Sequence, residues 1–121
     1  MYGVSSDLPL GAFVGKDFNQ VALGRFQIQF HCAGTGSIFV EGRWELRDAK
    51  GEVEDAWAEH AERRSYRIHT IIDVPVTRVE LDPPRSFTIV FEDGHRLTVF
   101  DETPQYESFS IHLNGQPSIY V

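Results

Sequence analysis

The chain has 121 residues, a formal net charge of −7, a 12% aromatic content and a single cysteine, Cys32. This length suits one domain covering residues 1–121, and its aromatic residues favour a packed core over disorder. The negative charge disfavours nucleic acid and anionic membranes as partners. One cysteine allows no internal disulfide, and neither a signal peptide nor a membrane span is expected. We therefore expect a cytoplasmic protein.

Strand patterns dominate the first third of the chain. Phe26, Ile28 and Phe30 alternate with polar residues, as in a strand with one buried face. Val21 and Leu23 precede this run. A glycine-containing turn over residues 32–37 leads to a further apolar strand at 38–40, and another strand is expected around 44–46.

The same order of features recurs in the second half, which indicates an internal repeat of residues about 12–48 and about 70–113. Asp93-Gly94 marks a hairpin turn. The last strand of the second copy is expected around residues 106–111. The alignment places matching apolar residues over one another: Phe13 with Ile71, Phe18 with Val76, Phe26 with Phe87, Ile28 with Ile89, and Phe30 with Phe91.

The segment between the copies, residues about 55–70, is predicted to be a helix. Trp57, Ala61 and Ile68 fall near one helical face, and Asp55 suits the N-cap position. The helix is favoured to about Arg64, because residues 66–72 also alternate as a strand would. The predicted fold is thus mostly β with one connecting helix. Its two antiparallel meanders either pack as a sandwich or close into a barrel.

No motif predicts catalysis, a cofactor or a metal. The five histidines lack the close spacing of metal ligands, and one cysteine provides no thiolate cluster. Gly34-Thr35-Gly36 has no following helix, so it reads as a hairpin loop and not as a phosphate cradle. Cys32 is expected to act as a small apolar residue. We therefore expect no cofactor, no metal site and no enzymatic activity.

Acidic residues cluster between positions 41 and 62, where eight acids stand against three basic residues. Such a run is either a solvated surface or an acidic face for a basic protein. In the second case, the candidate contacts lie on the connection between the first meander and the predicted helix. They are Glu45, Asp48, Glu52, Glu54, Asp55 and Glu59, with Trp57 as an aromatic anchor unless its ring packs in the core.

Four segments resemble a family of small bacterial β domains, and this family is similar in size and acidity to the immunity proteins of polymorphic toxin systems. The segments are Phe13-Val14-Gly15-Lys16, residues 37–42, residues 91–99, and Tyr106-Glu107-Ser108-Phe109. The resemblance implies a non-catalytic protein that neutralises a basic toxin by binding it, and it implies no catalytic residues. A homodimeric scaffold domain and a small-ligand-binding β-barrel are the alternatives.

Overall fold

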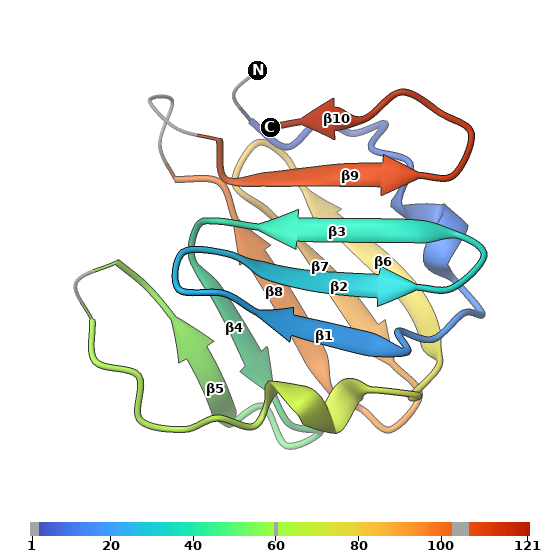
Figure 1. The fold of residues 1–121 in the computed structure, drawn as a ribbon. Helices are drawn as coiled ribbons and strands as arrows, with labels where there is room; N and C mark the ends of the chain where they lie inside the picture. The colour runs from blue at the N-terminus through green and yellow to red at the C-terminus, as the bar shows by residue number, and fades with distance from the viewer. Residues whose placement is uncertain (1–2, 60, 103–106) are drawn as a thin grey trace.

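The computed structural model describes residues 3–59, 61–102 and 107–121, and in them two five-stranded antiparallel sheets pack face to face (Figure 1). This confirms the mostly β fold, and of the two packings that the sequence left open the structure has the sandwich. The first sheet has the order β1 (Gln20–Leu23), β2 (Ile28–Cys32), β3 (Gly36–Val40), β9 (Phe109–Leu113) and β10 (Ile119–Tyr120). The second has the order β5 (Val53–Trp57), β4 (Trp44–Arg47), β8 (Arg96–Phe100), β7 (Ser86–Phe91) and β6 (Val76–Asp82).

The two halves of the chain have the same order of elements and exchange strands. Each half starts with a short 3₁₀ helix, η1 (Leu10–Phe13) or η2 (Ile68–Ile71), and continues into a three-stranded meander. Each half then sends two strands into the sheet of the other half, so that β9 pairs with β3 and β4 pairs with β8. The two meanders are therefore related by an approximate twofold arrangement.

Local geometry repeats with this arrangement. Gly15 follows η1 with φ 82°, and Asp73 follows η2 with φ 65°. The Gly15 N–H donates to the Val76 carbonyl at 2.8 Å, and the Asp73 N–H donates to the Phe18 carbonyl at 2.9 Å. Each half thus ties the start of its meander to the other half by the same hydrogen bond. Phe18 and Val76 take matching places in these two hydrogen bonds, and both side chains are buried.

The predicted alignment of the second strands is wrong by two residues. Ile28 pairs with Val40, and Phe87 occupies the same place by pairing with Val99. Ile28 therefore corresponds to Phe87, and Phe26 lies outside the strand, in the β1–β2 turn, with 72% of its surface exposed. A shift of two residues keeps every side chain on the same face of a strand, so alternation alone does not distinguish the two alignments.

The predicted helix over residues 55–70 is also wrong. Val53–Trp57 forms edge strand β5, in which Trp57 pairs with Trp44 and Asp55 pairs with Leu46. Among the described residues that follow, the helical element is the four-residue η2. Asp55 does cap a helix, but from a distance: its carboxylate accepts the N–H groups of Arg67 and Ile68 at the start of η2.

Phenylalanine rings fill the space between the sheets. Phe18 contacts three of these rings. Its ring centroid lies 5.5 Å from that of Phe13, 5.8 Å from that of Phe30 and 6.3 Å from that of Phe91. Phe87 and Phe109 form a second, edge-to-face pair at 4.9 Å. All six rings are fully buried, and they come from both halves of the chain, so the halves share one core.

Candidate functional site

The predicted acidic residues lie mainly on the β4–β5 hairpin, and several of them already have partners within the chain. Glu45 contacts the guanidinium group of Arg47 at 2.9 Å and that of Arg43 at 3.9 Å. Glu54 contacts His95 at 3.1 Å. Glu52 and Glu59 are exposed. The hairpin is therefore less negative than its acidic residues suggest, because arginine and histidine neutralise part of the charge.

Asp48 shapes the turn of this hairpin. Its carboxylate accepts the backbone N–H groups of Lys50 at 2.9 Å and Glu52 at 3.0 Å. The hydrogen bond from Glu52 is the main reason why the pKa of Asp48 lies below its ordinary value, because it stabilises the ionised form. Asp48 thus holds the turn that presents Glu52 to solvent.

Asp55 is not available to a partner, which corrects its place among the predicted contacts. The residue is 2% exposed, and Arg63 binds its carboxylate in a bidentate manner at 2.8 and 2.9 Å. Its oxygens also accept the backbone N–H groups of Ala56, Arg67 and Ile68. Asp55 therefore organises the connection that leads from β5 to η2.

His95 links the β7–β8 turn to the β4–β5 hairpin. Its Nδ1 lies 2.8 Å from Asp93, and its Nε2 lies 3.1 Å from Glu54. Partial burial disfavours the charged ring, but the hydrogen bonds and charges of both carboxylates outweigh burial and raise the pKa of His95. The folded state therefore binds this proton more tightly than the unfolded state does.

This linkage predicts a pH-dependent contribution of His95 to stability. The contribution is fully present below the ordinary histidine pKa near 6.5 and is lost as pH rises through the raised pKa of the folded state. We expect His95→Gln to lower the free energy of unfolding by up to about 1 kcal/mol more at pH 6 than at pH 8.5. Urea denaturation of both proteins at the two pH values measures the difference. An equal loss at both pH values would contradict the assignment.

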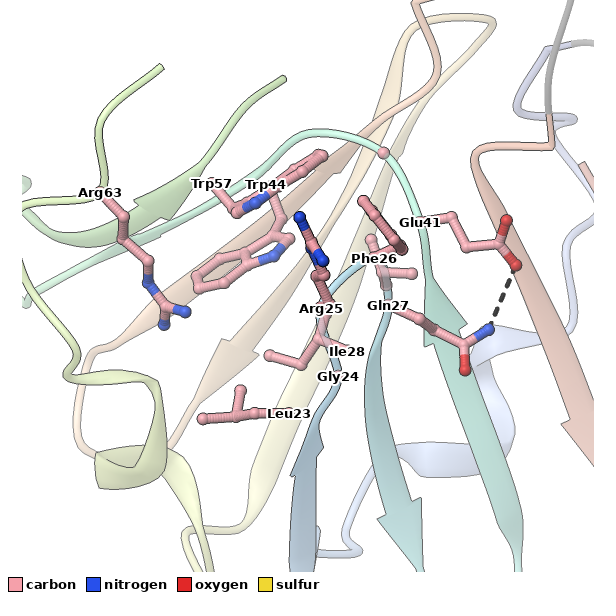
Figure 2. A pocket seen from close by; sticks show the side chains of 12 residues that line it. Leu23, Gly24, Arg25, Phe26, Gln27, Ile28, Glu41, Trp44, Trp57 and Arg63 are labelled. Carbon is pink, nitrogen blue, oxygen red and sulfur yellow. Dashed lines mark hydrogen bonds between the residues drawn. The ribbon is translucent and has the colours of Figure 1, made fainter. Parts of the chain in front are cut away.

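Trp57 lies at the edge of the sandwich, neither fully in the core nor fully exposed. It lines a small cavity of about 30 Å³ together with Trp44, the β1–β2 turn and Arg63. Figure 2 shows the two indole rings close together, with Arg63 on one side and Arg25 and Phe26 on the other. The cavity opens where edge strand β5 approaches the β1–β2 turn.

Large apolar side chains that line this cavity or lie near it are unusually exposed. Phe26 is 72% exposed, Leu23 60% and Tyr66 64%, in a chain whose other large apolar residues are mostly buried. Arg63 joins Tyr66 to the cavity, because its guanidinium carbon lies 4.2 Å from the Tyr66 ring and 5.1 Å from the Trp44 ring. We call this surface the aromatic–arginine patch; it consists of Leu23, Arg25, Phe26, Trp57, Arg63 and Tyr66.

The two arginines of the patch differ electrostatically. Arg63 is neutralised by Asp55, whereas Arg25 has no ion pair with the described residues and lies 5.2 Å above the ring of Phe26. At the border of the patch, Glu41 accepts a hydrogen bond from Gln27 at 3.1 Å. Burial raises the pKa of Glu107, and the neighbouring carboxylate of Glu41 raises it further. Within the described part of the chain, Arg25 is thus a cation without an ion pair, beside a partly acidic border.

The sequence interpretation located only part of this patch. It named Trp57, but it placed Phe26 in the core because the alternation of Phe26, Ile28 and Phe30 is regular. The available signal was Gly24-Arg25, which separates Leu23 from Phe26 and marks a turn. Because Leu23 pairs directly with Ile28, residues 24–27 make the turn and Phe26 lies at its tip.

Other classes of site find little support in the described residues. Among them no group of three or more metal-ligating side chains lies together, and Cys32 is buried as a free thiol. Within the same ranges, no helix is long and apolar enough to span a membrane. An open groove of about 280 Å³ lies between η1 and β6, lined mainly by aliphatic side chains. That volume is at the lower limit for small-molecule sites.

Comparison of the chain with models of protein families, with curated proteins and with solved structures finds no significant match. The surface described above is therefore the feature of the molecule that points to a function.

Proposed function

We propose that this chain is a non-catalytic binding protein that neutralises a partner protein, in the manner of an immunity protein that inhibits a basic bacterial toxin in the cytoplasm. The observation that carries the proposal is the aromatic–arginine patch, where Phe26, Leu23 and Tyr66 stay exposed around Trp57. Exposed apolar clusters of this kind mark interaction sites on soluble proteins.

The composition of the patch suits the centre of a protein interface. Trp, Tyr and Arg are the residues in which binding energy concentrates, and such residues cluster in a central region surrounded by less important contacts. Trp57 and Arg63 are held in place by β5 and by Asp55, so little conformational entropy is lost when they are covered. These two side chains of the patch are thus organised before any partner arrives.

The acidic hairpin supplies the second element of the proposal. Glu52 and Glu59 are exposed, and the net charge of −7 attracts a basic protein over a longer range than the patch does. Glu45, Asp48 and Glu54 contribute to this field as well. In this proposal the acidic residues speed association, and the patch slows dissociation.

Binding kinetics against the protein encoded by the neighbouring gene test the proposal. We expect Phe26→Asp to raise Kd about 30-fold or more, mainly through faster dissociation, because it places a charge at the centre of the interface. Glu52→Lys is expected to slow association at low salt and to have less effect at high salt. Val14→Asp, at an exposed site outside the patch, is the control. Absence of binding by the unmodified chain, or equal binding by Phe26→Asp, would contradict the proposal.

Self-association through the same patch is the alternative function, since an exposed apolar cluster also suits a homodimer. Sedimentation equilibrium of the chain alone distinguishes the two. A monomer at high concentration supports the heterologous partner. A dimer that Phe26→Asp dissociates supports the homodimer.

A further inference from the structure

The twofold arrangement gives the cavity of the aromatic–arginine patch a counterpart in the other half of the chain. Trp44 occupies the place of Phe109, because these residues pair with Val99 and Val40, which are themselves equivalent. Trp57, the partner of Trp44, then corresponds to Val121, which exchanges backbone hydrogen bonds with Phe109. The β1–β2 turn corresponds to the β6–β7 turn, which contains Pro84.

The N-terminal segment of the chain lies at this counterpart. The Val4 N–H donates to the Pro84 carbonyl at 3.0 Å, and the Gly3 N–H donates to the carboxylate of Asp101 at 2.5 Å. Val4 is 2% exposed and belongs to the core. A segment with a small aliphatic side chain therefore occupies this position in the other half.

In the other half, the corresponding segment is residues 61–67, and it does not occupy the position that matches Val4. Residues 61–67 precede η2 as residues 3–9 precede η1, so Glu62 corresponds to Val4 and Tyr66 to Leu8. Val4 and Leu8 are buried, whereas Glu62 and Tyr66 are exposed. Arg63 covers one side of Trp44, but no aliphatic side chain of this segment enters the cavity lining. The cavity of about 30 Å³ is what remains between the two indoles and the turn.

We propose that this cavity binds an extended segment of a partner protein, with a small aliphatic residue in the position that Val4 takes in the other half and a carboxylate beside Arg25. This inference rests on the proposed function and names the part of the partner that is recognised. The cavity size admits only a small side chain between the indoles. The carbonyls of Arg25 and Phe26 accept no backbone hydrogen bond from the described residues, so they are open to a backbone N–H of the bound segment.

The second requirement, a carboxylate in the bound segment, follows from the charges around the cavity. In the filled site Asp101 receives the Gly3 N–H, and its equivalent in the open site is Gly42; the carboxylate that lines the open site is that of Glu41, which accepts a hydrogen bond from Gln27. The open site also presents Arg25, a guanidinium group without an ion pair among the described residues. An acidic side chain in the bound segment gives Arg25 a charge-assisted partner. A basic toxin with one acidic, aliphatic loop satisfies both this site and the surrounding acidic hairpin.

Selection of displayed random octapeptides on the full chain tests the inference without any toxin. We expect enriched peptides to combine Val or Ala with Asp or Glu and to shift the indole resonances of Trp57 and Trp44 in NMR spectra. Arg25→Glu in the chain should weaken binding of these peptides at least about tenfold. Replacing the aliphatic residue of the peptide by Asp should weaken binding by a similar factor. Val14→Asp should leave binding unchanged. Arg25 is exposed, so its replacement is not expected to disturb folding.

Failure of selection, or peptides that bind Arg25→Glu as well as the unmodified chain, would overturn the inference. A stable dimer of the chain that excludes every peptide would overturn it too, since a second copy would then be the occupant. Peptide binding without binding to the neighbouring gene's product would leave the cavity assignment in place and remove the proposed toxin partner. If the toxin binds and neither competing peptides nor Arg25→Glu affect that binding, the toxin partner stays in place and the cavity assignment is removed.

Discussion

Replacing Asp55 by alanine is expected to lower the free energy of unfolding by about 3–5 kcal/mol. The carboxylate is buried and is bound by both nitrogens of the Arg63 fork and by the N–H groups of Arg67 and Ile68. Its removal leaves a largely buried guanidinium group and two backbone donors without their partner. The cost of those unsatisfied groups, more than the lost attraction itself, makes the effect large.

Urea denaturation of Asp55→Ala measures this loss, and two variants separate its causes. Asp55→Asn retains an acceptor oxygen for η2 but not the charge for Arg63, so we expect an intermediate loss. Glu52→Ala removes an exposed acid from the same hairpin and should change stability by less than about 0.5 kcal/mol. If Asp55→Ala costs less than about 1 kcal/mol, Asp55 does not organise the β5–η2 connection.

The second large effect is expected for Phe18→Ala, which should lower the free energy of unfolding by about 3–5 kcal/mol. Phe18 is 1% exposed, and its ring lies within 6.3 Å of the rings of Phe13, Phe30 and Phe91. Truncation opens a cavity at the point where the two halves meet. Neighbouring rings are held by both sheets, so they collapse into that space only partly.

Phe26→Ala is the matched control for this prediction, because it removes the same ring from an exposed turn. We expect a change of less than about 0.5 kcal/mol. Thermal or urea denaturation of both variants gives the comparison. Similar losses at the two positions would contradict the placement of Phe26 outside the core.

The strand pattern predicted the fold class because a half-buried strand requires alternation, as in Ile28 and Phe30 or Leu97 and Val99. Alternation does not fix register, so the alignment of Phe26 with Phe87 was wrong while the face of each strand was right. The helix prediction failed for a different reason. Trp57 and Ala61 have helical spacing, but pairing of β5 with β4 and the buried Asp55–Arg63 pair outweigh that local preference.

The candidate site was less predictable than the fold. Acidic residues are visible in any sequence, but most of their partners are not: His95 contacts Glu54 from a turn that only the pairing of β4 with β8 brings close. The aromatic–arginine patch depends on Phe26 lying at a turn and on Trp57 lying at an edge. Both placements follow from the register in which β1 pairs with β2 and β4 with β5. A periodic pattern of apolar residues does not determine that register.

The exchange of strands between the halves has a consequence for the independence of each half. A single half contributes three strands to one sheet and two strands to the opposing sheet. Without the other half, β3 and β8 lose their pairing partners β9 and β4, and the shared phenylalanine core is divided. Neither half is therefore a folding unit by itself, because the sandwich is complete only when both are present.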